Sequence, residues 1–81
     1  MGELKKEIID ILSNYAFDKK VLTNASEDSK IHKDLKINSA RIVDIVLDVE
    51  EKYEIEVEDR ELEKIITIGD VINIIRKKSK S

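Results

Sequence analysis

Ser39 is the residue whose type and position in this sequence best suit chemistry. It lies where a long polar stretch, residues 18–38, gives way to a periodic apolar segment. Asparagine and serine are good helix N-caps because their side-chain oxygens accept from free backbone N–H groups, so we expect a helix to begin at Asn38 or Ser39. From the residues alone, Ser39 is interpreted as a cap at the start of this helix.

A catalytic role for Ser39 finds little support in its surroundings. His32 is the single histidine, and a hydrolytic triad would have to combine it with Ser39 and Asp34. The sequence contains no G-x-S-x-G turn and no glycine-rich segment that would build an oxyanion hole. We therefore interpret His32 as a solvated loop residue and predict no catalytic residue.

Thiol and metal chemistry are equally unsupported by the composition. The 81 residues include no cysteine, so any thiol must come from an attached group. No D-x-[DN]-x-[DN]-G loop is present, and no metal site is predicted. The N-terminal segment resembles neither a signal peptide nor a membrane span, so we expect a cytoplasmic protein that does not insert into membranes.

Negative charge is concentrated in one part of the chain. The net charge is only −3, yet residues 44–63 hold ten carboxylates against Lys52 and Arg60. Such a block repels the phosphates of nucleic acid and attracts partners with basic surfaces. A solvated helix face is the alternative interpretation of the same residues.

Hydrophobic periodicity predicts an all-α fold with four helices in one domain. The first helix ends near Phe17, and a long loop over 18–38 leads to a central helix that is apolar over most of its circumference. Residues 54–58 form an extended connector, and Asp59 caps a short third helix. Thr67 and Asp70 form a capping box for the last helix. We predict a small bundle of three main helices and one short one over residues 1–81, with a frayed tail at 79–81.

Three stretches in this order resemble the acyl carrier protein family, and the resemblance covers nearly the whole chain. They are the Asp34-Leu35 pair ahead of Ser39, the EEKY-x-I-x-V run at 50–57, and the ITIGDVINII run that begins at Ile66. The resemblance implies that Ser39 is esterified with 4′-phosphopantetheine from coenzyme A. The thiol of this arm would carry acyl groups as thioesters in fatty-acid, polyketide or other specialised biosynthesis, without catalysis by the chain itself.

The resemblance also implies partners and a docking surface. The expected partners of this monomer are a phosphopantetheinyl transferase and acyl-transfer or synthase enzymes with basic docking surfaces. We expect them to contact Arg41 and the acidic stripe of Asp44, Asp48 and Glu51, which starts one turn after Ser39. The residues expected either to line an acyl pocket or to form plain core are Val43, Leu47, Leu62, Ile65 and Ile68.

The attachment region departs from the family pattern. Asn38 and Ala40 flank Ser39 where the family commonly has Asp-Ser-Leu, and Arg41 and Glu58 replace a frequent acid and a frequent proline. These differences predict a specialised member. The alternative hypothesis is a helical adaptor that keeps the fold and the acidic face without the prosthetic group.

Overall fold

The predicted all-α architecture is confirmed by the computed structural model, which describes residues 2–79. Three helices of twelve residues and one of four are joined by loops that contain two short 3-10 helices. In chain order the elements are α1 (Gly2–Ser13), η1 (Lys19–Leu22), η2 (Ser39–Arg41), α2 (Ile42–Tyr53), α3 (Asp59–Leu62) and α4 (Ile68–Ser79). Helix α4 thus includes Ser79, whereas positions 80–81 of the expected tail lie outside the described residues.

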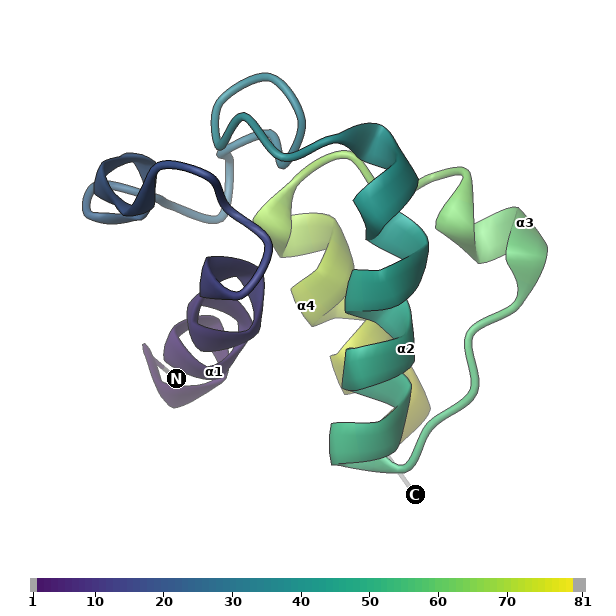
Figure 1. Ribbon diagram of the computed structural model, residues 1–81. Helices are drawn as coiled ribbons and strands as arrows, with labels where there is room; N and C mark the ends of the chain where they lie inside the picture. The colour runs from purple at the N-terminus through teal and green to yellow at the C-terminus, as the bar shows by residue number, and fades with distance from the viewer. Residues whose placement is uncertain (1, 80–81) are drawn as a thin grey trace.

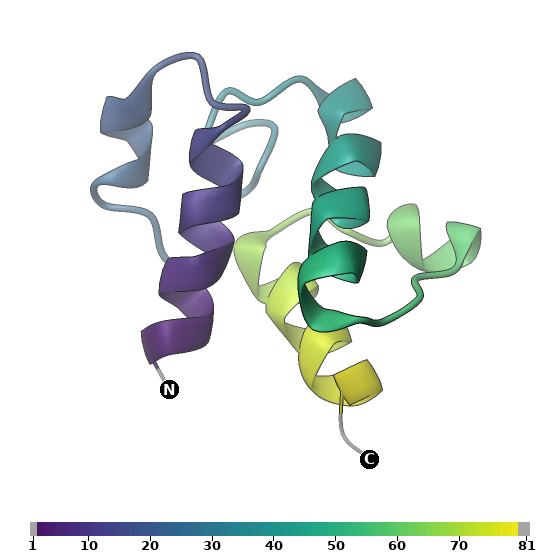
Figure 2. The ribbon, with the colours of Figure 1, turned by 60° about the horizontal axis from the view of Figure 1, so that its bottom comes forward.

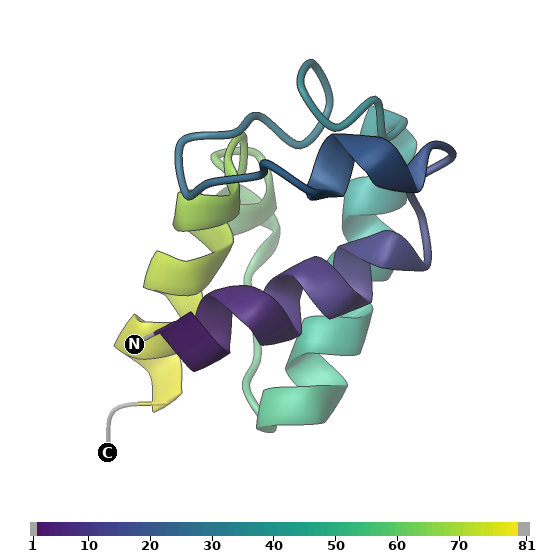
Figure 3. The ribbon, with the colours of Figure 1, turned by 90° about the vertical axis from the view of Figure 1, so that its left-hand side faces the viewer.

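Helix α2 is the centre of the bundle, as its apolar circumference predicted. It contacts α1, α3 and α4, and α1 also packs on α4. Figures 1 and 2 show α3 on the side of α2 opposite α1, and Figure 3 shows α1 crossing between α4 and α2. The largest fully buried side chains come from all three long helices and from the loop before η2: Ile8, Leu12, Ile31, Leu35, Ile37, Ile45, Val49, Ile68 and Ile72.

Helix α1 ends at Ser13, so the predicted end near Phe17 is wrong by four residues. Directly after Ser13 the backbone bonds have i+3 spacing: the N–H of Asn14 donates to Ile11 at 3.1 Å, and that of Tyr15 to Leu12 at 2.9 Å. Phe17 is 98% exposed, so no burial against the core favours a further helical turn there.

The long loop after α1 is ordered by its own apolar residues and by caps. It contains η1, whose N-cap Asp18 accepts from the backbone N–H of Lys20 at 2.9 Å. Asp34 closes a second turn by accepting from the N–H of Lys30 at 2.7 Å, and Leu35 beside it is buried. The Asp34-Leu35 pair therefore holds the loop on the core.

Caps also set where the last two helices begin. Thr67 and Asp70 form the predicted capping box: the Thr67 N–H donates to the Asp70 carboxylate at 2.9 Å, and the Asp70 N–H donates to the Thr67 hydroxyl at 3.1 Å. Helix α3 is capped by Glu58, so the prediction of Asp59 as its cap is wrong by one residue. Glu61, at the third helical position, accepts from the Glu58 N–H at 3.0 Å and so selects the earlier cap.

No helix in the described part of the chain has the length and apolar character that crossing a membrane requires.

Candidate functional site

Ser39 is exposed and is the first residue of η2, the turn that leads into α2. The cap of this turn is Asn38, whose side-chain oxygen accepts from the Ala40 N–H at 2.9 Å. Within residues 2–79 no hydrogen bond engages the Ser39 hydroxyl. Asn38 therefore caps the turn, and the hydroxyl of the adjacent Ser39 is not needed for capping.

A hollow of about 330 Å³ opens beside Ser39. Its lining comes from the loop before η2, from the start of α2 and from the segment between α3 and α4. The lining residues are Lys30, His32, Lys33, Ser39, Ile42, Ile65 and Ile66.

Backbone hydrogen bonds clasp the loop before η2 to the segment that precedes α4. The Ile31 N–H donates to the Ile66 carbonyl at 2.8 Å, and the Ile68 N–H donates to the Ser29 carbonyl at 3.1 Å. The Gly69 N–H donates to the Glu27 carbonyl at 2.8 Å, and a Cβ at Gly69 would lie only 3.0 Å from that oxygen. Glycine thus permits the close approach. In Figure 1 these two segments lie together above α4.

His32 and Asp34 do not form a triad with Ser39. The Nδ1 of His32 donates to the Ile37 carbonyl at 2.9 Å, and Asp34 accepts from the backbone of Lys30. Both side chains hold the loop in place. Among residues 2–79 there is likewise no cluster of three or more histidine or carboxylate side chains arranged to hold a metal ion.

The predicted acidic stripe on α2 divides into residues with different surroundings. Asp44 forms an ion pair with Arg41 at 3.1 Å, and Asp48 accepts from the Tyr15 hydroxyl. Glu51 is exposed, one helical turn after Leu47. A partner would therefore meet Glu51 directly, Asp44 together with the Arg41 cation, and Asp48 only beside the tyrosine.

The five residues expected to line an acyl pocket or to form plain core differ in burial. Val43 and Leu47 are 51% and 55% exposed on the outer side of α2, whereas Ile68 is fully buried in the core. Leu62 is partly buried, and Ile65 is a buried residue that also borders the hollow beside Ser39. Lys30, Lys33 and Ile66, which line the same hollow, were missed because the contacts that gather them are far apart in the sequence.

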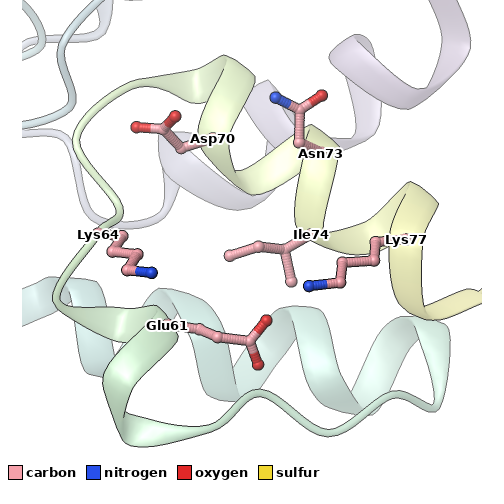
Figure 4. A pocket seen from close by; sticks show the side chains of 6 residues that line it. All are labelled: Glu61, Lys64, Asp70, Asn73, Ile74 and Lys77. Atoms are coloured by element: carbon pink, nitrogen blue, oxygen red, sulfur yellow. The ribbon is translucent and has the colours of Figure 1, made fainter.

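A second hollow, of about 240 Å³, separates α3 from α4 and has a charged lining (Figure 4). Lys78 crosses between these helices to form an ion pair with Glu61 at 2.8 Å, and this hydrogen bond lowers the pKa of the Glu61 carboxyl. The ion pair fixes α3 to the end of α4. The residues around the hollow are Glu61, Lys64, Asp70, Asn73, Ile74 and Lys77.

Comparison with known proteins decides the family. No protein-family model matches the chain. An acyl carrier protein of Campylobacter curvus is 47% identical over 53 residues, 65% of this chain and 69% of that protein. One from Thermotoga maritima is 39% identical over 56 residues, 69% of each chain, and one from Campylobacter concisus is 45% identical over 53 residues, 65% of this chain and 69% of that one. The chain belongs to the acyl carrier protein family.

Membership in the acyl carrier protein family confirms the resemblance drawn from the sequence. Acyl carrier proteins have no catalytic activity of their own, so the prediction of a non-enzymatic carrier is confirmed as well.

Two tyrosines tie the helices of this acyl carrier protein together. The Tyr15 hydroxyl donates to Asp48, and this hydrogen bond together with burial raises the pKa of Tyr15 to about 12. Burial, followed by donation to Glu7, also raises the pKa of Tyr53. The first bond joins the turn after α1 to α2, and the second joins the end of α2 back to α1.

We expect neither tyrosine to ionise near the ordinary value of 10.0. Because the folded pKa of Tyr15 is raised, the stabilisation from its hydrogen bond is fully present below pH 10 and is lost as the pH rises towards 12. The chain has two tyrosines and no tryptophan, so phenolate absorbance during an alkaline titration reports on them directly. Asp48→Asn should lower the pKa of Tyr15, whereas Glu51→Gln should not. A wild-type titration centred at pH 10 would contradict the two hydrogen bonds.

Proposed function

We propose that this chain carries acyl intermediates as thioesters on a 4′-phosphopantetheine arm attached to the Ser39 oxygen. The observation that carries the proposal is the exposed Ser39 hydroxyl at the start of the turn that leads into the central helix of an acyl carrier protein, while Asn38 caps that turn. The arm supplies a thiol, the nucleophile that this cysteine-free chain lacks.

The residues around Ser39 fit such an attachment. The hydroxyl lies outside the core, so a transferase reaches it without unfolding the bundle. Asn38 and the clasped loop hold the serine at a fixed place, and Lys30 and Lys33 supply positive charge beside the position of a phosphodiester. In the modification the Ser39 oxygen loses its proton and forms a bond to phosphorus, while the pyrophosphate bond of coenzyme A breaks and adenosine 3′,5′-bisphosphate leaves.

The test is incubation with coenzyme A and a broad-specificity phosphopantetheinyl transferase, followed by intact-mass measurement. We expect the mass to increase by one phosphopantetheine group. If several transferases left the chain unmodified, the carrier proposal would fail and the adaptor hypothesis would take its place. The outer side of α2 supports that alternative, because its exposed Val43 and Leu47 can bind a partner without any arm.

We propose that enzymes with basic surfaces dock on the outer face of α2, defined here as Val43, Asp44, Leu47 and Glu51. The two carboxylates give attraction and orientation, and the two exposed aliphatic side chains give apolar contact. Exposed ion pairs contribute about 0.2–1 kcal/mol each, which suits a carrier that must be released quickly.

Reversing two charges on the outer face of α2 should weaken docking. The double variant Asp44→Lys, Glu51→Lys is expected to raise the KM of the transferase for this chain by up to about tenfold at low salt, because two attractive contacts become repulsive. The difference should shrink as salt is added. Asp10→Lys, on the exposed side of α1, is the matched control. Equal KM values for the double variant and the control would place the docking surface elsewhere.

A further inference from the structure

The segment that carries Ser39 has an excess of positive charge, in contrast to the acidic residues 44–63. Residues 30–41 hold four lysine or arginine side chains and a single carboxylate, Asp34. Asp34 is engaged by the backbone N–H of Lys30, and Arg41 is paired with Asp44. Lys30 and Lys33, both exposed, supply the cationic side of the hollow beside Ser39.

The same hollow also has aliphatic lining residues. Ile66 is 56% exposed, although its carbonyl is fixed by the Ile31 N–H and the neighbouring Ile65 is only 5% exposed. Ile42, at the start of α2, is partly buried and borders the same space. The backbone hydrogen bonds between residues 27–31 and 66–69 thus hold an exposed aliphatic side chain in a lining that it shares with Ser39 and two lysines.

We propose that this hollow is a cradle for the base of the arm on Ser39, in which Lys30 and Lys33 pair with the phosphodiester and Ile66 contacts the branched dimethyl carbon next to it. The proposal rests on the proposed modification of Ser39. The chemistry matches at each point: an ammonium group is a strong partner for a phosphate oxygen, and an exposed isoleucine suits a dimethyl group.

Because the arm is attached covalently, weak contacts are sufficient to hold its base in the hollow. Tethering a group beside its site turns binding into an intramolecular event with an effective concentration in the millimolar range. The hollow, at about 330 Å³, is at the lower end of ligand-site volumes and accommodates only part of the arm. The base of the arm is held there, and the thiol stays available to partner enzymes.

The test uses NMR on the protein after complete modification, verified by intact mass. We expect nuclear Overhauser effects between the geminal methyl groups of the arm and the Ile66 side chain. We also expect a phosphorus chemical shift that moves with salt, because screening weakens the lysine contacts. The double variant Lys30→Gln, Lys33→Gln should reduce the nuclear Overhauser effects between the arm and Ile66. The expected reduction is up to about fivefold for each lysine, the factor that one exposed ion pair contributes. Lys20→Gln in η1 is the matched control and should leave them unchanged.

The measurements distinguish a failure of the proposed modification from a failure of the proposed cradle. Lack of a mass increase would overturn the modification of Ser39 itself. A fully modified protein with no contact between arm and Ile66, or with the same spectra for the double variant and the Lys20→Gln control, would overturn the cradle alone. Inorganic phosphate at millimolar concentration lacks the dimethyl group, so it should leave the Ile66 signals of the unmodified protein unmoved. If phosphate alone moved the Ile66 signals as far as modification does, the contact between Ile66 and the dimethyl carbon would be overturned.

Discussion

Ser39→Ala is expected to fold as the wild type does and to gain no mass with coenzyme A and a phosphopantetheinyl transferase, under conditions that convert the wild type fully. The reaction needs the hydroxyl oxygen, so the loss should be complete. Stability should change by less than about 0.5 kcal/mol, because Ser39 is exposed and no hydrogen bond engages its hydroxyl within residues 2–79.

Asn38→Ala is the matched control for this experiment. It removes the side-chain oxygen that accepts from Ala40, so it should lower the free energy of unfolding by about 0.5–2 kcal/mol. It keeps the Ser39 hydroxyl, so the variant should still gain one phosphopantetheine group. A mass increase in Ser39→Ala would show that another residue is the attachment point.

Leu35→Ala should lower the free energy of unfolding by about 2–5 kcal/mol. Leu35 is 1% exposed and packs in the core below the loop that carries Ser39, so truncation leaves a cavity. A chain of this size has a total stability of roughly 4–12 kcal/mol, so the variant should lose a large fraction of its stability. Urea unfolding followed by far-UV circular dichroism measures the change.

Leu47→Ala is the control with identical chemistry. Leu47 is 55% exposed on α2, and the same truncation there should change stability by less than about 0.5 kcal/mol. Similar losses in both variants would mean that Leu47 is buried in solution and that the outer face of α2 is covered. Leu47→Ala should also weaken partner docking, because it removes apolar contact area from the outer face of α2.

Local rules in the sequence were sufficient for several parts of this fold. The Thr67–Asp70 box was predictable because a cap and its acid lie three residues apart and depend on nothing else. The cap of α3 was harder, since Glu58 and Asp59 are adjacent acids and only the position of Glu61 distinguishes them. The central helix was also predictable, because hydrophobic periodicity depends only on residues close together in the sequence.

The surroundings of the candidate site were much less predictable. Helix α2 is apolar over most of its circumference, so periodicity could not tell that Val43 and Leu47 face solvent while Ile45 and Val46 face the core. The hollow beside Ser39 depends on bonds between the segments around residues 29–31 and 66–68, and no local pattern encodes them. The excess of cations ahead of Ser39 was the one signal in the sequence that pointed there.

The clasp between these two segments also bears on the order of events during synthesis. Its second half, from Ile66 to Gly69, leaves the ribosome after Ser39. Contacts of such long sequence separation form late in folding, because the intervening loop must first be closed. The serine therefore reaches its final surroundings only after residues 66–69 have been synthesised, and a transferase that requires these contacts acts after that point.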